Sequence, residues 1–432
     1  MAASCPCCNP SASPAGTFLN LIRTQYEGIR ADVPRLVEVG QSIGDALLDG
    51  GTLFIGRVAP FLPSEMGGRA GGMMNLRGKP ENAQDVGLFA VPDPRRWDAA
   101  GDETLKQLVE GKARLFVVGR PEDLPAKAAK RVSGFTGGTD PTIGCYAYGN
   151  YAPLASTRQF EQFVRAWITF GEAVAACTRG EKMPVLYMSV WLEGAIARNA
   201  AFSFTDYNNI GEPRDCKPLV PTPVFHHERY VPPLAAGYPA GEFLRTAGLF
   251  IDTLGRQLDT LAEAGRWIAE ALQAGKRVHV TAVGHSYPRI LELPTEEEGH
   301  GRGPGRRPVV SYDKSVYPLE WGPSMSNLLH ALPDDLGEGD VMLHLGYAPV
   351  VKERVDTILG RGIRLIHTSP YGRCKDTPEH PNFLWFDLPW RPGDADVDIP
   401  GYGARMMPAS STSHAIAYNA ILCEAAERMN WR

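Results

Sequence analysis

The stretch that decides the fold occurs twice, as ALLDGGTLFI at residues 46–55 and as ALQAGKRVHV at residues 271–280. Each copy has the pattern of a helix end, a glycine turn and an apolar strand. Two further segments recur in the same order: EGKARLFVVG from Glu110 matches EGDVMLHLGY from Glu338, and ASTRQFEQFVRAWITFGEA from Ala155 matches SSTSHAIAYNAILCEAAERM from Ser410. Three anchors in one order predict an internal duplication, with two domains related by a pseudo-twofold axis.

Short apolar runs alternate with helical patterns in both halves. Helices are expected at 15–48, 101–110, 123–132, 156–178, 191–201, 239–274, 323–331, 348–360 and 411–429, and strands at 52–56, 113–118, 143–148, 184–190, 277–283, 340–345, 363–368 and 383–387. This alternation predicts α/β domains, each a parallel sheet between two layers of helices. Pro34 allows either two helices or one kinked helix in 15–48.

The duplication sets the expected domain boundaries. Residues 1–13 are a tail, 14–202 the first domain, 203–237 a Pro- and Asn-rich linker, and 238–432 the second domain. If the halves are copies, strand 52–56 should superpose on 277–283, and strand 114–118 on 340–345. A chain of 432 residues is long enough for two domains that each bury a core.

Composition excludes several classes of partner. A net charge of -5 does not indicate a nucleic-acid-binding protein, which normally carries an excess of basic residues. No apolar run approaches the roughly 18–20 residues of a membrane span. The start, MAASCPCCNPSASPAG, lacks the basic and apolar regions of a secretory signal, so we expect a cytoplasmic protein. Cys5, Cys7 and Cys8 lack the C-x-x-C spacing of a structural zinc site.

Two segments of the second half suit a phosphate. Gly284-His285-Ser286 follows strand 277–283, where a glycine permits close approach of a ligand and a serine opens the next helix. Ser410, Ser411, Thr412 and Ser413 place four hydroxyls at a second helix start. Phosphate oxygens accept hydrogen bonds from such hydroxyls and from free backbone N–H groups. Plain helix capping explains either segment equally simply.

The same residues resemble a known family. AVGHS at 282–286 and DADVDIPGYGARMMPASSTSHAIAYNAILCEA from Asp394 are similar to the SIS (sugar isomerase) phosphosugar-binding domain, and most similar to a bacterial branch with GHS and RAGG segments. RAGG itself lies in the first half, in GRVAPFLPSEMGGRAGGM from Gly56, where it includes Arg69. The resemblance implies tandem SIS-like α/β/α domains that bind a small-molecule sugar phosphate.

Each half departs from the family pattern. The first-half turn reads Gly56-Arg57-Val58-Ala59 and has no hydroxyl, so its phosphate turn is degenerate. The second half lacks RAGG, and its second loop reads Leu345-Gly346-Tyr347-Ala348-Pro349 instead of being serine-rich. We therefore expect one composite site, with Arg69 brought to the Ser410–Ser413 helix start.

The resemblance also implies a reaction, the interconversion of aldose and ketose phosphates. Such an isomerase needs a carboxylate to carry a proton between adjacent carbons and a second group for ring opening. The expected catalytic residues are Glu65, His285 and His414, with Glu193 and Glu424 as further carboxylates. No cofactor, metal or nucleotide is expected. A non-catalytic sugar-phosphate-binding regulator and a phosphosugar lyase or etherase are the alternatives.

Two more expectations concern assembly and metals. The apolar helices at 15–48 and 239–274 offer surface for a homodimer, although paired domains in one chain also allow a monomer. His226-His227-Glu228 in the linker is a weak candidate metal site, because adjacent histidines rarely face one ion.

Overall fold

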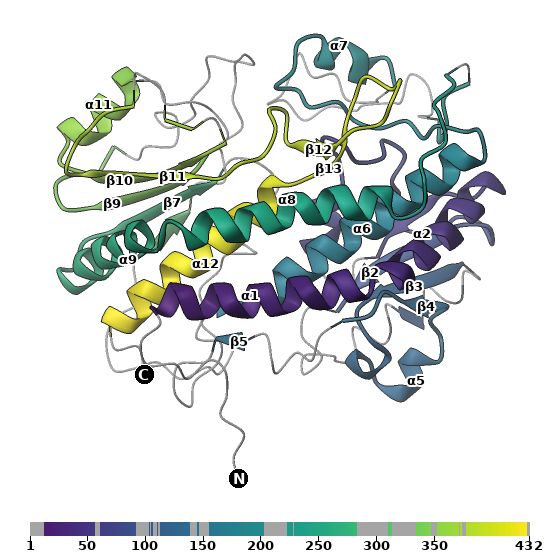
Figure 1. Cartoon of the computed structure of the whole chain (residues 1–432), viewed down its shortest axis with the longest axis horizontal. Coiled ribbons are helices and arrows are strands. Elements are labelled where there is room, and N and C mark those ends of the chain that lie inside the picture. The colour runs from purple at the N-terminus through teal and green to yellow at the C-terminus, as the bar shows by residue number, and fades with distance from the viewer. Residues whose placement is uncertain are drawn as a thin grey trace.

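Two parallel sheets lie at opposite ends of the molecule, with a layer of long helices between them (Figure 1). The structure is a computed structural model, and it describes residues 13–56, 61–91, 103, 105–106, 110, 113–138, 145–146, 155–202, 223–227, 229–282, 310–312, 334–346, 352–370, 372–373 and 377–429. The predicted α/β class is confirmed. No helix in these ranges is long and apolar enough to cross a membrane.

The first sheet is covered on both faces. Its parallel strands, in the order β1-β2-β3-β4, are β1 (Leu53–Ile55), β2 (Val86–Ala90), β3 (Arg114–Val118) and β4 (Gly134–Phe135). Side chains alternate between the faces as the strand period requires. Leu88 and Val118 belong to the core shared with the long helices, whereas Phe89 and Val117 pack with Leu124 and Ala128, beside the short helix α5 (Ala126–Ala129).

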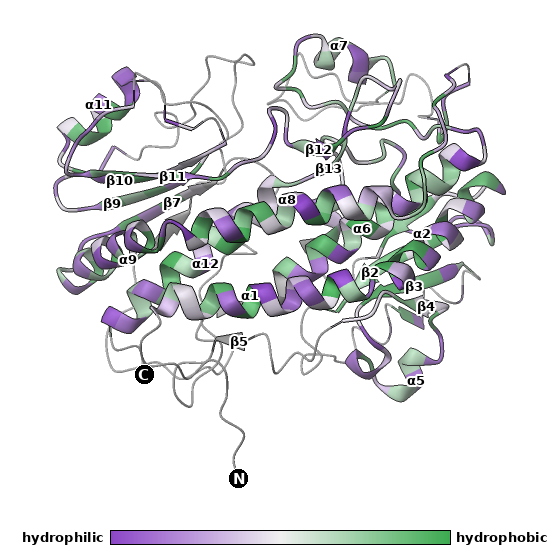
Figure 2. Cartoon of the chain, viewed as in Figure 1, coloured by the Kyte–Doolittle hydropathy of each residue, from purple (hydrophilic) through white to green (hydrophobic). Residues whose placement is uncertain are grey.

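The second sheet has one more strand in its hydrogen-bonded order. That order is β11-β10-β9-β7-β8, all parallel, with β7 (Val278–Ala282), β8 (Val310–Tyr312), β9 (Val341–Leu345), β10 (Arg364–Ser369) and β11 (Phe383–Asp387). Figure 2 shows these strands mostly in the hydrophobic colour, whereas the outer helix α11 (Lys352–Gly360) is mixed. Chain order reverses between β7 and β9, and ligands of open α/β sheets bind beyond the carboxyl ends at such a point.

Sheet position corrects part of the expected duplication. β9 lies directly beside β7, but β3 is separated from β1 by β2. The counterpart of strand 340–345 is therefore β2, and its expected superposition on strand 114–118 is wrong. β2 is not among the strands expected from the sequence, because its short apolar run follows a polar segment. The second sequence anchor therefore does not support a duplication, and the duplication stays a prediction.

The central helices pair within and across the halves. Within each half, α2 (Val33–Leu48) packs on α6 (Arg158–Arg179), and α9 (Leu258–Gln273) packs on α12 (Ser410–Arg428). Across the halves, α1 (Pro14–Ala31) packs on α12, and α8 (Tyr238–Gly255) packs on α6. Both crossings obey one pseudo-twofold relation, and side chains of both halves form one continuous core.

Several predicted elements have different limits. Pro34 marks a break into two helices, α1 and α2, and the expected helix 239–274 is likewise two helices, α8 and α9. Residues 184–190 form only isolated bridges, at Pro184 and Leu186, and the expected strand 143–148 is limited to β5 (Cys145–Tyr146), antiparallel to β6 (Ala155–Ser156). Helix 123–132 comprises the 3-10 turn Pro121–Asp123 and α5, and helix 191–201 is α7 (Ala195–Ala200).

Two expected helices fall wholly or largely outside the described residues: all of helix 323–331 and most of helix 101–110. The domain boundaries stay predictions, because the shared core and crossed helices join the halves closely. The homodimer also stays a prediction. The surface proposed for it is largely used within the chain, since the apolar faces of α1 and α8 pack on α12 and α6.

Candidate functional site

The RAGG segment reaches the second half because its glycines leave room for it. Helix α3 (Phe61–Met66) ends in a turn, and the chain then runs against the hairpin of β12 (Ala395–Val397) and β13 (Met406–Pro408). Gly71 has φ +76, and a Cβ placed there would lie 2.8 Å from both the Ala395 Cβ and the Met407 N. A side chain at this position would therefore push the hairpin away and separate Arg69 from the second half.

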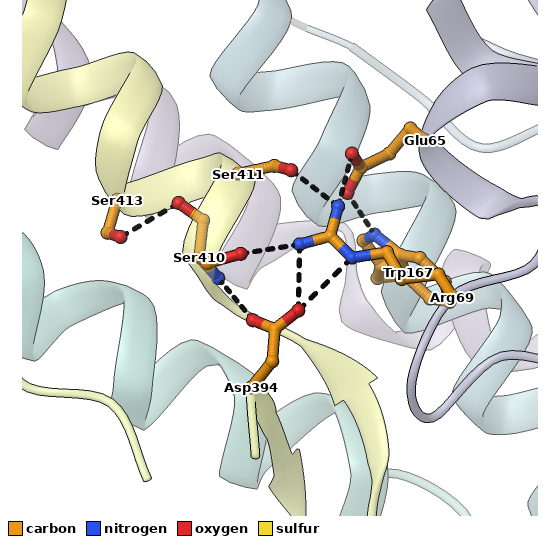
Figure 3. Close-up of polar contacts among 7 residues, drawn as sticks. All are labelled: Glu65, Arg69, Trp167, Asp394, Ser410, Ser411 and Ser413. Atoms are coloured by element: carbon orange, nitrogen blue, oxygen red, sulfur yellow. Dashed lines mark hydrogen bonds and ion pairs between the residues drawn. The ribbon is translucent and has the colours of Figure 1, made fainter. Parts of the chain in front are cut away.

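Arg69 is the centre of a buried polar cluster. Its guanidinium group donates to Asp394 Oδ2 at 3.1 and 3.3 Å and to Ser410 Oγ at 2.7 Å, and it also contacts Ser411 Oγ and the Glu65 carboxylate (Figure 3). Arg69 is only 1% exposed. The structure thus brings the expected first-half arginine to the expected hydroxyl-rich helix start of the second half.

Glu65 lies on the other side of this guanidinium group. Its Oε1 accepts a hydrogen bond of 2.9 Å from Trp167 Nε1 of α6, and its side chain is fully buried. Burial raises the pKa of Glu65 above its ordinary value, while the Arg69 charge acts in the opposite direction. A carboxyl group in such surroundings exchanges a proton closer to neutrality than an exposed one does.

Asp394 is a member of the cluster that sequence reasoning missed. Besides holding Arg69, its Oδ1 accepts from the backbone N–H of Ser410 at 2.9 Å and so caps α12. Asp394 has φ +70, and Met407, in the other strand of the hairpin, has φ +64. Non-glycine residues in this region are strained, and such residues gather at functional sites. Asp394 begins an alternating DADVD run, and nothing in its spacing distinguishes Asp394 from Asp396 or Asp398.

The start of α12 retains donors suited to an oxyanion. Ser413 Oγ donates to the Ser410 carbonyl at 2.9 Å and is thereby tied to the helix. Among the described residues, the Thr412 hydroxyl is buried without a hydrogen-bond partner. A helix has unpaired N–H groups in its first turn, and its dipole favours an anion there. The predicted hydroxyls therefore lie together, at one helix start and beside a cation.

His414 connects this helix start to the carboxyl end of β9. Its ring forms a hydrogen bond with the backbone of Gly346 and packs edge-on against Trp390 at 5.2 Å between centroids. Burial lowers the pKa of His414 to about 4, with Arg69 acting in the same direction. The imidazole is therefore neutral at pH 7.

Two further buried histidines lie on the strands of the second sheet, and no role for them was predicted from the sequence. His344 and His367 occupy registered positions on β9 and β10, and their rings stack at 5.1 Å between centroids. His344 Nδ1 hydrogen-bonds the Thr281 hydroxyl at 2.7 Å, and burial lowers the pKa of His344 well below its ordinary value. The sequence signal that could have identified them is a polar residue within each of two buried strands, because such strands normally carry aliphatic side chains.

The other expected residues fall into two groups. Gly284, His285 and Ser286 lie outside the described residues, as do Tyr347, Arg57, Glu228 and the cysteines at 5, 7 and 8. Glu193 is exposed, two residues before the start of α7, and it is not part of the cluster at Arg69. Glu424 is buried, but its Oε1 accepts from the Ala15 N–H at 3.0 Å, so it caps α1.

The candidate metal site in the linker includes His226, which hydrogen-bonds Tyr402 Oη at 2.9 Å. Within the described ranges, no group of acidic, His or Cys residues is arranged to hold a metal ion.

Comparison with known proteins gives fold likenesses only. No family model and no curated protein matches the sequence. Among solved structures, the C-terminal domain of glucosamine-fructose-6-phosphate aminotransferase from Francisella tularensis superposes with a TM-score of 0.48 at 9% identity, covering 96% of this chain and 97% of that one. A proposed phosphosugar isomerase from Clostridium difficile 630 gives 0.44 at 9% identity, covering 95% and 91%. One from Silicibacter pomeroyi DSS-3 gives 0.41 at 9% identity, covering 95% and 98%. The α/β assignment rests on the sheet order and helix packing described above.

Proposed function

We propose that this chain binds a sugar phosphate and acts as an aldose–ketose sugar-phosphate isomerase. The single observation that carries the proposal is the meeting of Arg69 with Ser410 and Ser411, at the start of a helix directed at the carboxyl edge of the second sheet. That edge is where open α/β sheets bind ligands.

The phosphate is assigned to the start of α12. The hydroxyls there, the first-turn N–H groups and the helix dipole all favour an anion, and a buried guanidinium group adds a full positive charge. The Thr412 hydroxyl is a buried donor that a phosphate oxygen would satisfy. Gly284 and Ser286 are proposed to complete the same phosphate site from the end of β7.

Proton transfer is assigned to the groups beside that site. Glu65 takes a proton from one carbon of the sugar and returns it to the adjacent carbon. The sugar phosphate passes through an enediol between these two steps. His414, or His285 at the end of β7, handles the hydroxyl proton and assists ring opening. The raised pKa of Glu65 and the neutral imidazole of His414 support these roles, because both groups then exchange protons without strong acid or base.

The first experiment separates binding from no binding. A sugar phosphate held at about 100 times its dissociation constant should raise the free energy of unfolding by about 2.7 kcal/mol. Thermal unfolding with a panel of aldose and ketose phosphates measures this effect. Ser411→Ala and Ser286→Ala should each weaken binding by about 1–3 kcal/mol. Ser42→Ala, which removes a hydroxyl bonded to the Glu38 carbonyl on α2, is the control and should bind normally. A panel without any stabilising sugar phosphate rejects the proposal.

The second experiment separates catalysis from binding. Incubation of a bound sugar phosphate in deuterated water should place deuterium on C2, and Glu65→Gln should abolish this exchange while retaining the thermal shift. A non-catalytic binding protein is the second candidate, and one observation favours it: Glu65 is completely buried and held by Arg69 and Trp167. Binding without deuterium exchange in the wild-type chain would select that candidate.

A further inference from the structure

A cluster of positively charged side chains lies around Tyr402, in the loop between β12 and β13. The Arg198 guanidinium carbon lies 5.3 Å from the Tyr402 ring centroid, and that of Arg229 lies 5.6 Å from it. Arg198 comes from α7 and Arg229 from the segment before α8, so two distant parts of the chain direct their cations to one ring. Tyr402 is only 1% exposed and fixes both of them in place.

The bonds that hold these arginines are to neutral acceptors. Arg198 donates to Tyr402 Oη at 2.9 Å and to the Leu186 carbonyl at 2.8 Å, and Arg229 donates to the Tyr402 carbonyl at 2.7 Å. No carboxylate within the described part of the chain forms an ion pair with either. Elsewhere the buried arginines, such as Arg69 and Arg165, are paired with acids. Among the described residues, the two guanidinium groups at Tyr402 are therefore held together by neutral acceptors alone.

The pKa of His226 responds to the positive charge of these two arginines. Its Nε2 hydrogen-bonds Tyr402 Oη at 2.9 Å, and its ring packs against Tyr402 and Phe202. After burial, the groups that lower the pKa of His226 are Arg198, Arg229 and His227, all of them cationic or basic. The same two arginines are the charged groups that act on the Tyr402 hydroxyl. An imidazole that is neutral here adds a polar donor without adding to the repulsion.

The cluster is also accessible. Arg229 and His227 are exposed, and Arg198 and His226 are partly exposed. Each guanidinium group has five N–H donors in a planar fork, which exceeds the hydrogen bonds described for either arginine and matches the geometry of a phosphate or carboxylate. We infer that Arg198, Arg229 and His226 form an oxyanion-binding site on Tyr402, separate from the buried cluster at Arg69.

Site-specific chemical protection tests this inference. Phenylglyoxal modifies accessible arginines, and peptide mass mapping gives the rate at Arg229 directly. Inorganic phosphate or acetate should slow modification of Arg229 several-fold and leave exposed Arg35 of α2 unaffected. Protection by phosphate alone assigns a phosphate group, and protection by acetate as well assigns oxyanions generally. Equal rates at Arg229 with and without both anions overturn the inference.

Variants show whether the arginines act together. Arg198→Gln should remove the protection of Arg229, because one guanidinium group alone holds an anion weakly. Tyr402→Phe keeps the ring but removes the hydroxyl that anchors Arg198, and it should reduce the protection in the same direction. Ser411→Ala should leave protection at Arg229 unchanged, so failure of the sugar-phosphate site and failure of this site are distinguishable. Protection that survives Arg198→Gln would overturn the two-arginine site.

Discussion

The final helices of the two halves, α6 and α12, share one structural role but differ in chemistry. Counted from the helix starts at Arg158 and Ser410, Glu172 and Glu424 occupy the same position. Glu172 accepts from the backbone N–H groups of Gly237 and Ala240, at the start of α8, and Glu424 accepts from that of Ala15, at the start of α1. Each half thus caps the first helix of the other half.

The difference lies at the starts of these helices. α12 begins with four consecutive hydroxyl residues and receives Arg69 from the other half, whereas α6 begins at Arg158 after Thr157 and contributes its own buried Arg165. Arg165 pairs with Glu161 of the same helix and with Asp32 of the same half. The shared scaffold therefore holds the halves together, and the hydroxyls and the crossing arginine distinguish the start of α12 from that of α6.

The largest expected effect comes from removing that crossing cation. Arg69→Met should lower the free energy of unfolding by about 3–5 kcal/mol, because Glu65 and Asp394 would remain buried without a counter-charge. Urea unfolding measures the loss. Arg245→Met, at an exposed arginine paired with Glu242 on α8, is the control and should change stability by less than about 1 kcal/mol. Comparable values for the two variants would mean that Arg69 does not join the halves.

Acid should open the second half before the first. All ten histidines of the chain follow residue 225, and burial holds the pKa of His414 at about 4. An unfolded histidine has a pKa near 6.5, so the stabilisation is complete above that pH and is lost as the pH falls toward 4. The depressed pKa of His414 alone corresponds to about 3 kcal/mol. Amide hydrogen exchange at pH 5 should show faster opening of β9, β10 and α12 than of β2 and β3. Uniform acceleration across both sheets would contradict this.

Replacing Gly71 should lower the free energy of unfolding more than replacing Gly68. Both have positive φ, but a Cβ at Gly71 would meet the Met407 backbone, whereas one at Gly68 has nothing within 4 Å. Gly68→Ala should cost about 1–2 kcal/mol from backbone strain alone. Gly71→Ala should cost roughly 1–3 kcal/mol more, from overpacking against the hairpin. Denaturant unfolding of the two variants provides this comparison, and equal losses would show that the RAGG segment is not closely fitted to β13.

The sequence predicted what depends on local pattern. Short apolar runs located β7, β9 and β10, a helical pattern opened by Ser and Thr located α12, and the resemblance placed Arg69 with Ser410 and Ser411. β2 was missed because its short apolar run follows a polar, Asn- and Asp-containing segment. Asp394 was missed because an alternating DADVD run gives three equivalent carboxylates, and only the folded chain brings one of them, Asp394, to Arg69. The cap by Glu424 depends on a contact with a residue 409 positions away, which no local pattern contains.

The smallest expected effect tests the comparison of the two caps directly. Glu172 uses both carboxylate oxygens, with Oε1 accepting from Ala240 and Oε2 from Gly237, whereas Glu424 uses only Oε1 on α1. A glutamine has one acceptor oxygen and one amide nitrogen. Glu172→Gln must therefore place an NH2 group against a backbone N–H and should cost about 1–2 kcal/mol.

Glu424→Gln can keep its single hydrogen bond to Ala15 and should cost less, about 0.5 kcal/mol from the lost charge near a helix N-terminus. Both substitutions retain the Cβ atoms that lie against Gly40 and Gly265, so helix packing is unchanged in each. Chemical denaturation of both variants and of the double variant measures the difference. If Glu424→Gln proved the more damaging, the α1 cap would carry more of the interface than its one hydrogen bond implies, and the two crossings would not be equivalent in energy.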